Sequence, residues 1–276
     1  MIDRKLLIRR ASLTAYFVLA FLVFLFFLFP FDRVKSRIES EVRLRTPVEL
    51  SVARVSPRFF NRFALFDVAV SDRDGRVLFE SPSAHATVSL FGLLRGVLSV
   101  DLRADAYGGE MVLRARQGRG LQSLLVDADS LDLASYSLLR DLGLRVAGKI
   151  GGNLEMNGDS GKGRIWAKGL ATRELRVKGF PAPDFDFEQG WLEGEFKGGR
   201  LTIKKLELEG KELKARVTGD MVLSGQGMLN LTVRLKFSER LAREQAGLIS
   251  LLKNRDADGF YQFGVGGTLA SPLPRL

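Results

Sequence analysis

Apolar and polar residues alternate through most of the stretch LTIKKLELEGKELKARVTGDMVLSGQGMLNLTVRL, which runs from Leu201 to Leu235. The alternation is broken at Gly210-Lys211-Glu212 and again at Ser224-Gly225-Gln226-Gly227. Because successive side chains of a strand point to opposite faces, this pattern predicts strands with one apolar face and one polar face. The apolar face must then be covered by helices, by another sheet, or by the sheet curling on itself.

The same pattern continues over most of the chain beyond Pro47. Strand-like segments such as VELSVARV and RFALFDVAV alternate with turn sequences, among them Asp72–Gly75 and Gly108-Gly109, and the total is roughly fourteen strands. Only residues 133–143 and 238–254 look helical, and both segments are short. Since the connections are too short for parallel crossovers, we expect a mainly β fold, a curved and mostly antiparallel sheet with two short helices.

Glycine content and the lack of helices leave two arrangements for this sheet. The chain holds 29 glycines, and glycine within strands permits bends and bulges. One arrangement is a sandwich closed by its own side chains, and the other is an open trough lined with aliphatic side chains. The candidate groove residues are Leu206, Leu208, Leu213, Val217, Leu229, Leu231, Val233 and Leu235.

The N-terminal segment Ala11–Phe31 contains 21 residues without a charge. A helix of that length spans about 30 Å, which matches the hydrocarbon core of a bilayer. A cleaved signal peptide would end in small residues, whereas this run ends in the bulky sequence FFLFPF. We therefore predict an uncleaved transmembrane anchor, whose length is marked by Ala11, Tyr16, Phe21, Phe26 and Phe31.

The residues that follow the anchor set the domain boundary. Val34, Ile38 and Val42 recur every four residues, which predicts a juxtamembrane helix that ends before Pro47. Basic residues flank the span on both sides, so charge does not decide its orientation. A ten-residue tail on one side and a large β domain on the other favour a single-pass protein of the bacterial inner membrane. Residues 1–46 then form the cytoplasmic tail, anchor and juxtamembrane helix, and residues 47–276 form a β-rich periplasmic domain.

The net charge of +10 is concentrated near the anchor. Residues 1–46 carry nine Lys or Arg against four Asp or Glu, and residues 47–276 carry thirty-three against twenty-eight. Half of the excess thus surrounds an apolar run, which suits lipid headgroups better than nucleic acid. The chain has no cysteine, so disulfides and thiolate chemistry are excluded.

No motif for catalysis or metal binding emerges. His85 is the only histidine and has no partner motif. The stretch Gly158–Gly163 fails the spacing of a phosphate-binding loop, and Asp127–Asp132 fails that of an EF-hand, so a hairpin turn and a helix cap are the interpretations. We expect no enzyme, no cofactor and no metal site. Carboxylates alternate with the aromatic residues Phe185, Phe187 and Trp191, which favours core packing over a stacking platform for a base or sugar.

The whole arrangement resembles a known family. An N-terminal anchor precedes a glycine-punctuated β domain that contains LGLRVAGKIGGNLEMNGDSGKGRIW, and the chain ends in DGFYQFGVGGTLASPLPRL with a closing Gly267–Pro272 motif. This is similar to the type II secretion system protein N family, GspN, and to the wider AsmA-like group of envelope proteins. The motifs include no catalytic signature, so the resemblance carries over no catalytic residue.

The resemblance implies an accessory component of the machinery that exports folded proteins. Its partners would be the bilayer, through the N-terminal helix, and other secretion-system proteins. The AsmA-like likeness implies an alternative, a lipid-binding or lipid-transfer module that holds phospholipid in an apolar β groove. No nucleic acid is expected among the partners.

Overall fold

A computed structural model of the chain describes most residues after position 47. The predicted anchor Ala11–Phe31 lies outside the described residues, and no helix within the described part is long and apolar enough to cross a membrane. Of the predicted juxtamembrane helix, the residues that are described are helical. The described residues are 48–59, 61–118, 120–141, 143–174, 176–177, 180–181, 183–223, 227–250, 254–268 and 271–275, with Ser36, Glu39, Ser40, Arg43 and Leu252.

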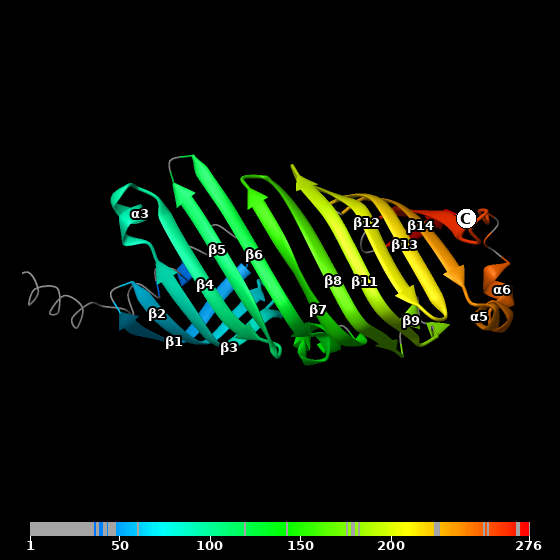
Figure 1. Ribbon diagram of the computed structural model, residues 1–276, viewed down its shortest axis with the longest axis horizontal. Helices are drawn as coiled ribbons and strands as arrows, with labels where there is room; N and C mark the ends of the chain where they lie inside the picture. Colours follow the sequence, from blue (N-terminus) through cyan, green and yellow to red (C-terminus); the bar gives the residue numbers. More distant parts are fainter. Residues whose placement is uncertain are drawn as a thin grey trace, which may run out of the picture.

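Fourteen strands form one antiparallel sheet, in which each strand pairs with the next along the chain. This confirms the mainly β, antiparallel fold (Figure 1). The strands are β1 (Val48–Phe59), β2 (Arg62–Asp72), β3 (Val77–Val88), β4 (Leu98–Ala106), β5 (Gly109–Gly118), β6 (Leu121–Asp132), β7 (Arg145–Asn157), β8 (Ser160–Arg173), β11 (Phe185–Lys197), β12 (Arg200–Gly210), β13 (Leu213–Val222), β14 (Leu229–Phe237), β15 (Tyr261–Gly267) and β16 (Pro272–Arg275). Between β8 and β11, β9 (Arg176–Val177) and β10 (Phe180–Pro181) form a separate two-stranded extension.

The helices are short and lie at the ends of strands, not over the sheet (Figure 1). The first predicted helix is divided into η1 (Leu133–Ser135) and α4 (Ser137–Asp141), and the second into α5 (Glu239–Glu244) and α6 (Ala246–Ile249). A further short helix, α3 (Leu90–Leu94), joins β3 to β4. Ser238 caps the N-terminus of α5, because its hydroxyl accepts a hydrogen bond from the Leu241 nitrogen, 3.2 Å away.

The sheet is bent as well as twisted, so that β1–β3 pass behind the strands that follow (Figure 1). Two residues other than glycine contribute bends, Asp67 in β2 with φ of 50° and Ser130 in β6 with φ of 55°. At Ser130 the register between β6 and β7 shifts, which is the signature of a β-bulge. Curvature therefore does not depend on the glycines alone.

A packed core occupies the N-terminal end of the sheet. Four small side chains on β1–β4 form it, and each is at most 6% exposed. They are Val52, Val68, Ala84 and Ala104, and larger half-buried side chains such as Leu65, Phe79 and Leu102 surround them. Small residues at the centre allow these four adjacent strands to pack closely around one another.

Candidate functional site

Cross-strand pairing aligns apolar residues into continuous rows across the sheet. Directly paired residues of antiparallel strands point to the same face, so the register shows which side chains lie together. The first row crosses twelve strands through Leu65, Ala84, Ala104, Met111, Ala128, Gly152, Ile165, Leu192, Leu206, Val217, Val233 and Phe263.

A second row runs beside the first, and it is equally apolar. Neither row contains a charged or hydrogen-bonding side chain, and we call the side of the sheet to which both rows point the apolar face. The second row consists of Phe63, Ala86, Leu102, Leu113, Val126, Leu154, Gly163, Gly194, Ile203, Gly219, Leu231 and Val265.

All eight groove residues named from the sequence lie on the apolar face. Leu206, Val217 and Val233 belong to the first row and Leu231 to the second. The other four are paired with apolar residues in neighbouring rows: Leu208 and Leu235 with Ala215, Leu213 with Phe237, and Leu229 with Met221. Leu229 is buried, and the other seven are half-buried.

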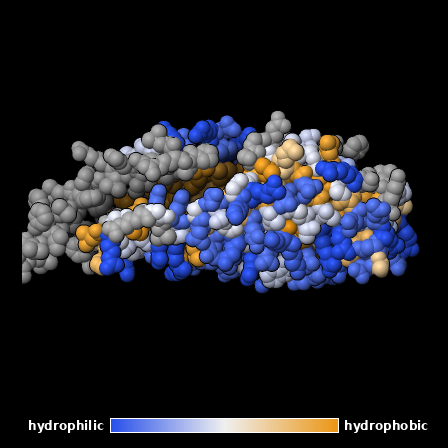
Figure 2. Space-filling model, turned by 90° about the horizontal axis from the view of Figure 1, so that it is seen from above, coloured by the Kyte–Doolittle hydropathy of each residue, from blue (hydrophilic) through white to orange (hydrophobic). Residues whose placement is uncertain are grey.

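The apolar face is open in its middle. Leu154 of β7 and Ile165 of β8 keep 39% and 44% of their surface exposed, which a packed sandwich would not allow. Among the described strands, β1 and β16 each have a single neighbour, so the sheet does not close into a barrel. Figure 2 shows a hollow lined by hydrophobic residues between hydrophilic rims. Of the two arrangements left by the sequence, the structure is the open trough.

Glycines lower the floor of the trough where it is most open. Gly163 of β8 and Gly194 of β11 face each other, between Leu154 on one side and Ile203 on the other. A Cβ atom added at Gly163 would lie 3.3 Å from the Asn153 carbonyl oxygen and 3.4 Å from Leu154 Cδ1. The position could therefore hold a side chain with little adjustment of its neighbours, and glycine leaves that volume empty.

Aromatic side chains gather beside the N-terminal core. Tyr107 lies edge-on to both Phe79 and Tyr136, with ring centroids 6.0 and 5.2 Å away. Burial raises the pKa of the Tyr107 phenol, although the hydrogen bond from the Glu80 amide acts in the opposite sense. Burial likewise raises the pKa of Tyr136, whose hydroxyl donates to the Leu78 carbonyl oxygen, 2.8 Å away. Both phenols are thus neutral structural groups.

The opposite face of the sheet is polar and holds exposed ion pairs. Cross-strand pairs join Lys162 to Glu155 at 3.2 Å and Arg164 to Glu193 at 3.2 Å. Such exposed pairs each contribute about 0–1 kcal/mol to stability. Their main effect is to keep this face in water, which fixes the apolar face as the inner one.

Two tryptophans interrupt the polar face. Trp191, expected in the core, is instead 51% exposed and pairs across the strands with Trp166. The Trp166 ring occupies the space above Gly151, and the Lys168 ammonium lies 5.1 Å from its centroid. Core packing is correct for Phe187, which is 6% exposed. The prediction failed for Trp191 because residues 185–197 change face partway along β11, where the register with β12 shifts at Phe187–Gln189.

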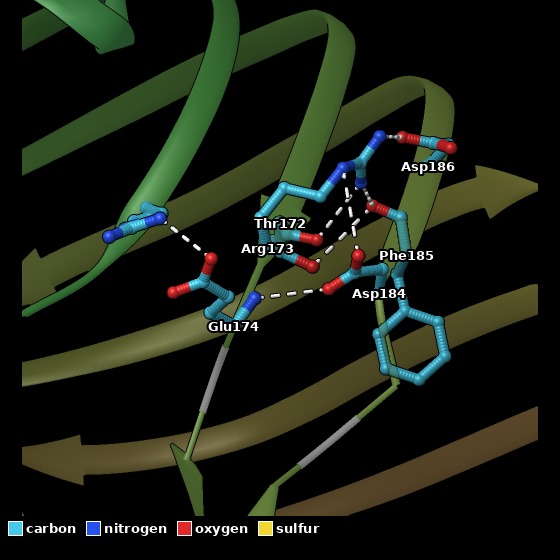
Figure 3. Close-up of polar contacts among 7 residues, drawn as sticks. Thr172, Arg173, Glu174, Asp184, Phe185 and Asp186 are labelled. Carbon is cyan, nitrogen blue, oxygen red and sulfur yellow. Dashed lines mark hydrogen bonds and ion pairs between the residues drawn. The ribbon is translucent and has the colours of Figure 1, made fainter.

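A polar network holds the base of the β9–β10 extension (Figure 3). The Arg173 guanidinium donates to the Thr172 and Phe185 carbonyl oxygens and forms an ion pair with Asp186. The Glu174 nitrogen donates to the Asp184 carboxylate, 3.0 Å away. The cationic and anionic groups satisfy one another here, so the network clamps the chain where it leaves the sheet.

The motifs rejected as catalytic occupy ordinary positions. His85 is exposed on β3, opposite Ala64 and Arg103. Gly158 lies in the β7–β8 turn with φ of 62°, and Asp132 caps η1 through the Ala134 nitrogen. Within the described ranges, no three His, Cys, Asp or Glu side chains are grouped so that they could hold a metal ion.

Comparisons with protein-family models, curated proteins and solved structures give no match for this chain. The candidate site is therefore identified from the geometry of the sheet. Sequence reasoning missed the open middle of the trough, formed by Leu154, Gly163 and Ile165. Apolar and polar residues do alternate in this part of the sequence. However, the glycines on the apolar face also interrupt the run of large apolar residues by which a groove is recognised.

Proposed function

We propose that the apolar face binds lipid acyl chains, and that the protein is a lipid-binding module. The observation that carries the proposal is the pair of apolar rows that cross twelve strands without a polar side chain, half exposed in their middle. Monomeric soluble proteins rarely expose contiguous apolar surface of this extent. An occupant that buries it gains about 0.8 kcal/mol for each CH₂ group removed from water.

The chemistry of the trough favours a hydrocarbon chain over a protein partner. Protein interfaces combine aromatic and arginine anchors with about one hydrogen bond per 100–200 Å², and the two rows offer no hydrogen-bonding side chain. An acyl chain needs none. Because the trough is open along one side, a headgroup can stay in water while the chain lies against Leu154 and Ile165. The resemblance to AsmA-like proteins supports the same function.

An accessory role in type II secretion stays a prediction of the family resemblance. Its test is recovery of other secretion components with the full chain from membranes. Normal secretion in a deletion strain, together with no such recovery, would count against it.

Photo-crosslinking of the full chain in membranes tests lipid binding directly. Lipids with a photoreactive group on the acyl chain are expected to label peptides from β7 and β8 on the apolar face. Ile165→Glu places a charge in the open middle of the trough, and we expect about tenfold less labelling because an unpaired carboxylate against hydrocarbon costs more than 1.4 kcal/mol. Ile165 is already 44% exposed, so the substitution is not expected to unfold the domain.

The matched control is Thr218→Glu, which adds the same charge at an exposed strand position on the polar face. It is expected to leave labelling unchanged. Labelling confined to residues 11–31, or equal labelling of both variants and the parent chain, would overturn the proposal.

A further inference from the structure

Three hairpin tips meet at one corner of the sheet, near its N-terminal end. They belong to the β1–β2 hairpin, the β3–β4 connection with α3, and the β5–β6 hairpin. The Val88 nitrogen donates to the Asn61 carbonyl oxygen at 2.9 Å, which holds the first tip against the second. Gly118 lies directly on the backbone of Gly96, where an added Cβ atom would be 2.3 Å from the carbonyl oxygen. We call the described residues of the ranges 57–66, 88–100 and 113–122 the N-terminal rim.

The N-terminal rim exposes large apolar side chains. Leu94 is 86% exposed and Phe91 62% exposed, both on α3 (Figure 1), and Leu98 at the start of β4 is 43% exposed. The Arg95 guanidinium lies 4.1 Å from the centroid of the Phe91 ring. Single exposed apolar residues need no explanation, but three such residues at one tip, two on α3 and one at the start of β4, form a patch in contact with water.

Charge is segregated to the same rim. Its described residues include five arginines and no Asp or Glu, a charge of +5, whereas the other residues of 47–276 carry no net charge in total. Arg58, Arg62, Arg95 and Arg116 are all exposed. Protruding apolar side chains beside arginines, with Asp101 opposite Arg114 as the carboxylate at the border of these segments, match the interface of an anionic bilayer, where apolar groups enter the acyl boundary and cations meet phosphates.

We propose that the N-terminal rim docks onto the surface of an anionic lipid bilayer, with Phe91 and Leu94 inserted and the arginines on the headgroups. A second copy of the chain is a poorer occupant, because two rims of charge +5 repel each other. Each juxtamembrane cation contributes about 1 kcal/mol near an anionic surface. The contact is independent of what the trough holds; with an acyl chain in the trough, it would bring the trough beside the bilayer.

The absence of cysteine makes single-site labelling of the full chain straightforward. Leu94→Cys carries an environment-sensitive fluorophore, and the protein is reconstituted into vesicles of phosphatidylglycerol and phosphatidylcholine or of phosphatidylcholine alone. In the anionic vesicles we expect blue-shifted emission and quenching by nitroxides attached to the acyl chains. The matched control is Asp159→Cys, an exposed site at the tip of the β7–β8 hairpin, which is expected to stay in water.

A charge-reversed variant separates the two parts of the contact. Replacing Arg58, Arg62, Arg95 and Arg116 by Glu is expected to abolish quenching at position 94 in the anionic vesicles. Emission at position 94 equal to that at position 159 would overturn the proposal. So would shielding without acyl-chain quenching, which indicates a protein contact, and so would equal quenching in phosphatidylcholine alone. If the parent chain shows quenching at position 94 but no acyl-chain crosslinking in the trough, only the proposed function is overturned.

Discussion

The Tyr107 hydroxyl accepts a hydrogen bond from the backbone nitrogen of Glu80, 2.8 Å away and 27 residues earlier in the chain. Tyr107 lies in the β4–β5 turn with φ of 50°, and Glu80 lies in β3. The bond thus ties a strained turn to the strand beside it. Tyr136 extends the contact to the η1–α4 connection, since its ring packs on Tyr107.

Tyr107→Phe is expected to lower the free energy of unfolding by about 1 kcal/mol, because it removes one hydrogen bond and leaves the Glu80 amide without its acceptor. Urea unfolding followed by circular dichroism measures the change. Tyr261→Phe is the control, because it removes a hydroxyl from a ring that packs against Phe237 in the C-terminal half. Equal loss in both variants would show that the Glu80 bond contributes nothing specific.

The same cluster predicts sensitivity to alkali. Burial raises the pKa of Tyr107 and of Tyr136 above the usual value of 10.0. For a raised pKa, the stabilising contribution is complete below the unfolded-state value and is lost as the pH rises through the folded-state value. We therefore expect unfolding free energy to fall above pH 10, and the fall to be smaller when both tyrosines are replaced by Phe. Unfolding series between pH 8 and 12 on the two proteins, run in parallel, measure the difference.

Low pH is expected to destabilise the loop before β15. The hydrogen bond from Arg234 lowers the pKa of the Asp256 carboxyl below its usual 3.8, and the Phe260 amide adds to the effect. For a lowered pKa, the contribution is present above the unfolded-state value and is lost as the pH falls through the folded-state value. We expect the hydrogen-exchange protection of residues 254–260, relative to the intrinsic exchange rate at each pH, to fall below pH 4, and Asp256→Asn to have little protection already at neutral pH. The same rate in both proteins at neutral pH would remove Asp256 from any role in ordering this loop.

Two substitutions by alanine, one in the N-terminal core and one in the trough, test whether the middle of the apolar face is open. Val68→Ala removes two methyl groups from the N-terminal core, where Val68 is 6% exposed, and is expected to lower the free energy of unfolding by about 2 kcal/mol. Ile165→Ala removes more carbon atoms from the trough, but Ile165 is 44% exposed, so we expect the free energy of unfolding to fall by less than about 1 kcal/mol. Thermal unfolding of the two variants ranks them. A larger loss at Ile165 would mean that the middle of the face is covered in the folded protein.

The fold was largely predictable from the sequence, because alternation with period two survives in nearly every strand and the connections are short. The described residues within 201–235 lie mainly in β12, β13 and β14, with the turn at Lys211-Glu212 between the first two. The openness of the trough was not predictable, because it depends on whether β1 meets β16. That outcome follows from the accumulated bend at positions such as Asp67 and Ser130, where a residue without a strong preference for positive φ adopts it under tertiary constraint.

The candidate site was predicted in part. Large aliphatic residues on β12–β14 identified the face, because alternation is strongest there. The open middle on β7, β8 and β11 was missed, since Gly163 and Gly194 contribute to the site through the space left by their missing side chains. A glycine in a strand is consistent with a bulge, a bend or a close approach, and only the cross-strand register shows that these two glycines face each other on the apolar side.

Gly163→Val tests whether the missing side chain at position 163 matters for lipid binding and not for folding. Valine favours strands, and its Cβ atom would meet the Asn153 oxygen at 3.3 Å and Leu154 Cδ1 at 3.4 Å, contacts that small shifts relieve. We expect the free energy of unfolding to change by less than about 1 kcal/mol. The added methyl groups raise the floor of the trough, so acyl-chain crosslinking to β7 and β8 is expected to fall severalfold. Gly152→Val is the contrasting variant, because its Cβ atom would lie 2.2 Å from the Arg164 oxygen and cannot be accommodated without moving the backbone. We expect Gly152→Val to lose stability, and Gly163→Val to keep its stability but show reduced crosslinking, which would separate binding from folding. Unchanged crosslinking in a stable Gly163→Val protein would mean that acyl chains do not lie over this part of the sheet.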